Sequence, residues 1–160
     1  MDSGALIILR TEIEAQMTLI HALYQRLDER VADLHPEHQV LMESAAYQLH
    51  NLYSAIENLL QLMAAHFENH ISDTARWHTA LLQRMSVEIP GVRPAVVSSE
   101  SYDLLNGLRG FRHFFRHAYG AEIEYAQLQL NLDKAQTLRP LFDADIARFI
   151  DALQDRASGA

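Results

Sequence analysis

The residues best suited to chemistry lie in one basic segment of an otherwise acidic chain. No acidic residue occurs between Asp103 and Glu122, although the whole chain has 13 Lys and Arg against 21 Asp and Glu, a net charge of −8. On a helical wheel, the basic side chains of this segment fall within an arc of about 140°. They are Arg109, Arg112, His113, Arg116 and His117. The segment therefore predicts an amphipathic helix with a basic, solvent-facing side.

These residue types together suit a phosphodiester. Arginine offers a planar, permanently charged fork that matches phosphate oxygens, and histidine can exchange a proton near neutral pH. The opposite side of the helix carries Phe111, Phe114 and Phe115, which we expect to be core or interface anchors rather than platforms for stacked bases. The simpler alternative for the basic side is a solvated surface with no ligand.

Composition limits the class of protein. With 160 residues, 49% of them hydrophobic, the chain is long enough for one domain with a proper core, and we expect a single domain over residues 1–160. There is no cysteine, no basic and apolar leader at the N-terminus and no apolar run of the roughly 20 residues that a membrane span needs. We therefore expect a soluble, cytoplasmic protein. Its acidity argues against general adhesion to nucleic acid, so any contact with RNA must be local.

Apolar residues recur at spacings of three and four along most of the chain, which predicts helices. The expected helices cover residues 6–34, 36–69, 75–87, 98–119 and 122–157. Pro36 is expected to start the second helix, Ser98 or Ser99 to cap the fourth, and Pro140 to kink or break the last. Residues 89–97 should be extended. The predicted fold is an all-α antiparallel bundle of four to five helices.

The basic segment also carries a motif. Arg112, His117 and Tyr119 form the pattern R-x4-H-x-Y, late in an all-helical chain. This pattern resembles the signature of HEPN-domain ribonucleases, specifically the HepT-type toxins that pair with MNT-type minimal nucleotidyltransferase antitoxins. The stretch His50-Asn51-Leu52-Tyr53 through Glu57 and the run Gly91-Val92-Arg93-Pro94 are similar to members of this group as well. One departure is His113, where such ribonucleases often have Asn or Asp.

The resemblance implies a toxin of a type VII-like toxin–antitoxin system, acting as a metal-independent endoribonuclease without a cofactor. His117 would take the proton of a ribose 2′-hydroxyl, and Arg112 would neutralise charge on the phosphate that this oxygen attacks. Arg109, His113 and Arg116 would support the phosphate. Because Arg112 and His117 lie about 140° apart on one helix, we expect a homodimer that forms one composite site, which is also the arrangement that the family implies.

The resemblance further implies regulation at Tyr119. In HepT-type systems the partner nucleotidyltransferase transfers AMP to the tyrosine of the motif. An adenylate at this position would bring bulk and negative charge beside Arg112 and His117, and so block an anion site. The ordinary alternative is a tyrosine that packs its ring at the end of a helix.

Two other classes of function remain open at this point. His113 and His117 are four residues apart, as are His66 and His70, a spacing at which two imidazoles on a helix can share a metal ion. With His50, the first pair could form a three-histidine site resembling that of DinB-like metal-dependent proteins. The other alternative is a non-catalytic, HEPN-like docking or nucleotide-binding partner.

Overall fold

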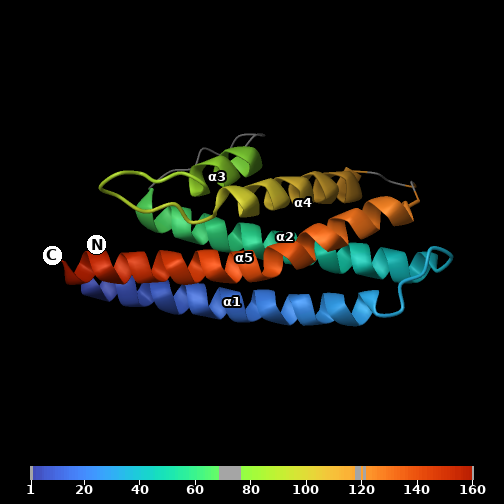
Figure 1. Cartoon of the computed structure of the whole chain (residues 1–160), viewed down its shortest axis with the longest axis horizontal. Coiled ribbons are helices and arrows are strands. Elements are labelled where there is room, and N and C mark those ends of the chain that lie inside the picture. Colours follow the sequence, from blue (N-terminus) through green and yellow to red (C-terminus); the bar gives the residue numbers. More distant parts are fainter. Residues whose placement is uncertain (1, 69–76, 118–119, 121, 160) are drawn as a thin grey trace.

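The structure is a computed structural model that describes residues 2–68, 77–117, 120 and 122–159. In this part of the chain the regular structure is helical, as predicted (Figure 1). The helices are α1 (Ser3–Val31), α2 (Gln39–Phe67), α3 (Trp77–Met85), α4 (Ser99–His117) and α5 (Tyr125–Ser158). None of the helices described is long and apolar enough to cross a membrane.

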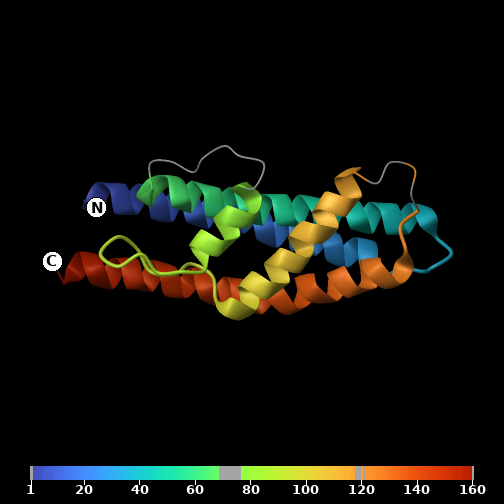
Figure 2. The same ribbon diagram turned by 90° about the horizontal axis from the view of Figure 1, so that it is seen from above.

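Three long helices form the body of the molecule. The helix α1 runs antiparallel to both α2 and α5, and the two ends of the chain lie at the same end of the bundle (Figure 1). Seen from above, α3 and α4 lie across this body, with α4 passing obliquely from α5 toward α2 (Figure 2). The arrangement places α4 over the seam between two long helices, which supports one of its sides and leaves the other open.

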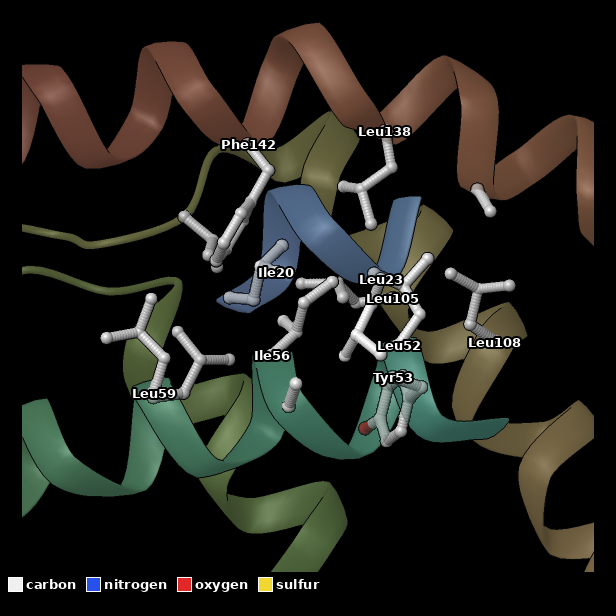
Figure 3. Close-up of a cluster of buried hydrophobic side chains, with 14 of the residues drawn as sticks. Ile20, Leu23, Leu52, Tyr53, Ile56, Leu59, Leu105, Leu108, Leu138 and Phe142 are labelled. Carbon is white, nitrogen blue, oxygen red and sulfur yellow. The ribbon is translucent and has the colours of Figure 1, made fainter. Parts of the chain in front are cut away.

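The core lies where α4 crosses the long helices. Apolar side chains from α1, α2, α4 and α5 meet there (Figure 3). They include Ile20, Leu23, Leu52, Tyr53, Ile56, Leu59, Leu105, Leu108, Leu138 and Phe142, all of them buried. Since each of these helices has a single apolar stripe, their burial requires the helices to pack together. This packing fixes the rotation of α4 about its own axis.

Two local predictions are wrong. Pro36 does not start a helix: it lies in a turn in which the His38 amide donates to the His35 carbonyl (3.0 Å), and α2 begins at Gln39. Residues 89–97 are not simply extended, because Ile89 and Arg93 exchange backbone hydrogen bonds of 3.0 Å around a tight turn. Gly91 takes a positive φ of 78° in this turn, a conformation that favours glycine.

Pro140 bends α5 without breaking it. The helix is continuous from Tyr125 to Ser158 with Pro140 inside, and its two halves lie at an angle to each other (Figure 1). The cause is the missing amide of proline, together with the clash of its ring with the preceding turn. The nearby Ala135 carbonyl accepts a hydrogen bond of 2.7 Å from the buried Tyr24 hydroxyl of α1. The two helices are thus joined one turn before the bend.

Buried polar contacts fix the segment between α3 and α4. Arg93 is fully buried, and its guanidinium donates to a Glu68 carboxylate oxygen (3.2 Å) and to the Arg84 carbonyl (2.9 Å). Further along, Ser98 caps α4 by accepting a hydrogen bond from the Ser101 amide (3.2 Å), which confirms one of the two predicted caps. Arg93 therefore anchors the segment before α4 to α3 and the end of α2, whereas the start of α4 is held to α5, because the Ser98 amide donates to the Asp145 carboxylate (3.1 Å).

Truncating a core side chain at the crossing should be costly. Leu52→Ala removes a side chain with no exposed surface, so we expect the free energy of unfolding to fall by about 2–5 kcal/mol. Leu19→Ala is the matched control, because Leu19 is 46% exposed and its loss should change that free energy by less than about 0.5 kcal/mol. Urea denaturation measures both. Equal losses would contradict this description of the core.

Candidate functional site

A pocket of about 400 Å³ lies between α3 and α4. Every basic residue predicted for the site contributes to its wall, together with two residues of α3. The lining residues are His78, Thr79, Arg109, Arg112, His113, Arg116 and His117. The structure thus brings together the five basic side chains of α4 on one concave surface, with an α3 histidine facing them.

Four of these five side chains follow the predicted helical wheel. His113, Arg116 and His117 are exposed, and Arg109 is half-buried. The Asn106 side-chain oxygen, one turn earlier, accepts hydrogen bonds from Arg109 Nε (3.2 Å) and Nη2 (2.9 Å). The rings of His113 and His117 lie 4.5 Å apart, centroid to centroid. These residues give the pocket a wet, positively charged wall that is free to meet an anion.

Arg112 departs from the prediction that it lies on the solvent-facing side. It is only 6% exposed, and its guanidinium binds the Glu57 carboxylate with two hydrogen bonds, Nη1 to Oε1 (3.0 Å) and Nη2 to Oε2 (3.1 Å). The wheel gave its angle correctly. It could not show that Glu57, on the buried side of α2, draws the side chain into the contact between the two helices.

Two other α2 residues, Tyr53 and Ser54, also contact the Arg112 side chain. Its guanidinium carbon lies 4.6 Å from the centre of the Tyr53 ring, a cation–π contact, and Nη1 also donates to the Ser54 hydroxyl (3.3 Å). Burial raises the pKa of the Tyr53 hydroxyl well above its usual range, and the nearby Glu57 carboxylate adds to this effect. Tyr53 therefore stays neutral and adds no negative charge to the site.

His78 is one of two lining residues, with Thr79, that the sequence did not single out. Its Nδ1 lies 2.8 Å from Glu57 Oε2, and its ring centroid lies 3.9 Å from that of Trp77. One signal was available: Glu57 stands one helical turn after Tyr53 at a spacing that otherwise places apolar residues in the core, and a buried carboxylate needs partners. The sequence could not tell which cations would supply them.

The phenylalanines of α4 do not behave alike. Phe111 is 8% exposed and part of the core, and Phe115 packs partly against it. Phe114, expected to be an anchor, is 52% exposed, so it is not a core residue in this chain. It lies beside Gly110 on the wall of a second pocket, between α4 and α5.

The alternative three-histidine metal site does not form. His50 packs against the Phe115 ring, at 5.7 Å between centroids, and the described residues contain no group of three His, Asp or Glu side chains placed to hold a metal ion. Burial lowers the pKa of His50, and the charges of Arg112 and Arg116 lower it further, although a hydrogen bond with Asn51 opposes this. His50 is thus kept neutral beside the basic side of α4. In the other predicted pair, His70 lies outside the described residues.

Tyr119, the predicted modification site, also lies outside the described residues, two positions beyond the end of α4. The other two residues of the motif, Arg112 and His117, lie within the described part of the chain. Arg112 and His117 both line the pocket between α3 and α4, so one chain brings them to a common surface despite their angular separation on the helix.

The described helices form a bundle of the HEPN-like class, and its fourth helix presents arginine and histidine to one pocket. The chain belongs to the HepT-like family, since the model of that family, described as HepT-like protein, matches residues 44–153. This family relates the chain to HEPN toxins that are paired with a nucleotidyltransferase. No curated protein and no solved structure gives a significant match.

The Glu57–Arg112 pair should be expensive to break from one side. Glu57→Gln leaves a buried guanidinium without its counter-charge, so we expect the free energy of unfolding to fall by about 3 kcal/mol. Glu14→Gln is the matched control, because Glu14 pairs with Arg10 where both side chains are more than half exposed, and its loss should cost less than about 1 kcal/mol.

Removing both charges of the Glu57–Arg112 pair distinguishes the cost of an unpaired buried charge from a simple loss of packing. The double variant Glu57→Gln/Arg112→Met should recover part of the stability that Glu57→Gln loses, because no buried charge is then left unpaired. Chemical denaturation of the three variants in parallel is the measurement. A double variant less stable than Glu57→Gln would show that the pair is not the source of the effect.

Proposed function

We propose that this protein is an endoribonuclease toxin that cleaves RNA in the pocket between α3 and α4 without a metal ion. The observation that carries the proposal is the convergence of Arg112 and His117 on that pocket, with Arg109 and Arg116 beside them. Three guanidinium groups against the single carboxylate of Glu57 leave an excess of positive charge where a phosphate would bind. The match to the HepT-like family supports the same chemistry.

The reaction is transfer of the phosphate to a neighbouring hydroxyl. His117 takes the proton of the ribose 2′-hydroxyl, and the 2′-oxygen attacks the adjacent phosphorus. Arginine side chains stabilise the charge that develops on the phosphate oxygens. The P–O5′ bond then breaks, which leaves a 2′,3′-cyclic phosphate and a 5′-hydroxyl. The need for a 2′-hydroxyl restricts the activity to RNA.

Arg112 has a defined role in this scheme. Its hydrogen bonds to Glu57 and Ser54 come from the two terminal nitrogens, and a guanidinium has a further N–H at Nε. Because Glu57 and Tyr53 hold the group in place, its charge is pre-positioned and needs little rearrangement when a phosphate binds. Arg109 and Arg116 are more accessible and make the first contact with the RNA backbone.

Cleavage of a mixed RNA pool tests this function. We expect the wild-type protein to cleave RNA in excess EDTA, His117→Ala to lose about 10²- to 10⁴-fold in rate, and Arg112→Ala to lose about 10²- to 10³-fold. A matched control is Arg139→Ala, because Arg139 pairs with Asp28 on the α1–α5 side of the bundle and should leave the rate unchanged. A wild-type protein that leaves the pool intact contradicts the proposal.

We also propose that two copies associate through the end of α4 and share one site. The exposed Phe114, on the wall of the pocket between α4 and α5, offers an apolar contact. Mixing Arg112→Ala chains with His117→Ala chains separates two arrangements. A site shared between copies regains activity in the mixed dimer, because one intact arginine and one intact histidine meet there. A pocket that is complete within each chain gives no recovery.

The proposed antitoxin is a nucleotidyltransferase that transfers AMP to Tyr119. Tyr119→Phe keeps the ring but removes the acceptor oxygen, so this variant should cleave RNA at the wild-type rate yet resist inactivation by the nucleotidyltransferase and ATP. The gain in mass of one or more AMP groups on the wild-type chain, absent from the variant, provides the measurement. Equal inactivation of both proteins would mean that the antitoxin acts by binding or at another residue.

A further inference from the structure

His78 has no role in the scheme above, yet it lines the pocket and contacts a buried carboxylate. It belongs to α3, on the wall of the pocket opposite the basic side of α4. Its side chain is 31% exposed, whereas that of its partner Glu57 is 5% exposed. The histidine therefore has one edge in the protein and another available to whatever occupies the pocket.

The shortest contact of His78 favours one tautomer. The hydrogen bond of 2.8 Å joins Nδ1 to Glu57 Oε2, and an ionised carboxylate only accepts, so Nδ1 carries a proton. Arg112 Nη2 also lies 3.2 Å from Nδ1, but the shorter contact to a charged acceptor is the stronger one. The nitrogen left to exchange a proton with a ligand is Nε2.

A carboxylate and an aromatic ring hold the imidazole in place. Glu57 fixes one nitrogen, and Trp77 covers the ring with a centroid distance of 3.9 Å and an angle of 34° between the planes. A buried carboxylate that binds Nδ1–H orients the ring, as in the hydrolases that use a His–Asp pair. The same carboxylate binds Arg112, so a single buried acid sets the positions of an arginine and a histidine.

We propose that His78 is the general acid of the proposed RNA cleavage, an inference that rests on the function proposed above. Protonated Nε2 donates its proton to the 5′-oxygen as the P–O5′ bond breaks, while His117 accepts the proton of the 2′-hydroxyl as the P–O2′ bond forms. One proton enters the enzyme and one leaves it in each cleavage. The two histidines come from different helices that line the same pocket, which lets them act on the entering and the leaving oxygen.

A substrate with a better leaving group tests this role. The probe is an RNA oligonucleotide cut by the wild-type protein at a mapped linkage, made with either oxygen or a 5′-bridging sulfur at that linkage. Sulfur leaves as a thiolate without a proton, so a general acid is dispensable. His78→Gln keeps a hydrogen-bond donor for Glu57 but cannot supply the proton. We expect this variant to be slower by about 10²- to 10⁴-fold on the oxygen linkage and close to the wild-type rate on the sulfur linkage.

Two controls make the result specific. His117→Gln should be slow on both linkages, because the 2′-hydroxyl must still lose its proton. His66→Gln should be unaffected on both, since His66 makes an equivalent 2.8 Å contact with the Glu12 carboxylate away from the pocket. Thermal unfolding followed by circular dichroism verifies that each variant is folded.

The outcomes distinguish the two proposals. His78→Gln that is equally slow on both linkages, or slow on neither, overturns the role of His78 while wild-type cleavage still supports the proposed function. Wild-type protein that cleaves no RNA overturns both.

Discussion

The buried ion pair between Glu57 and Arg112 is the constraint on which the site depends. Two hydrogen bonds of 3.0 and 3.1 Å join α2 to α4, and both side chains are nearly excluded from solvent. Such a pair adds little net stability, since desolvation offsets most of the attraction, but either charge alone would be strongly unfavourable. The pair therefore specifies how α4 is rotated and placed on α2, more than it strengthens the fold.

The apolar core supports the same placement. Leu105 and Leu108 direct one side of α4 into the cluster formed with α1, α2 and α5 (Figure 3), while Arg93 and Ser98 anchor the preceding segment and the start of the helix. Because the apolar core and these polar contacts both fix its position, α4 can expose His113, Arg116 and His117 without losing its packing. The exposed basic side is thus a consequence of the buried side, and α3 closes it into a pocket.

Glu57 also links the structural and the chemical halves of the site. Its carboxylate accepts from Arg112 and from His78 at once, so the acid that fixes α4 against α2 also orients an imidazole of α3. The three arginines that line the pocket outnumber this one carboxylate, which leaves the pocket positively charged. A fold stabilised in this way is suited to hold charged groups in fixed positions for a phosphate, which is the requirement of electrostatic catalysis.

Spacing and residue type determined the helical class, the approximate extent of the helices, a cap at Ser98 or Ser99 and the basic character of α4, because these are local properties of the sequence. The motif formed by Arg112 and His117 was also visible in the sequence, and so was the relation to the HepT-like family. The tertiary structure decided what depends on contacts between distant segments. It turned Arg112 inward to Glu57, left Phe114 exposed, separated His50 from the α4 histidines and brought His78 to the pocket. A helical wheel gives the direction of a side chain but not the neighbour that it contacts. Here the Glu57 carboxylate of α2 determines where the Arg112 guanidinium lies.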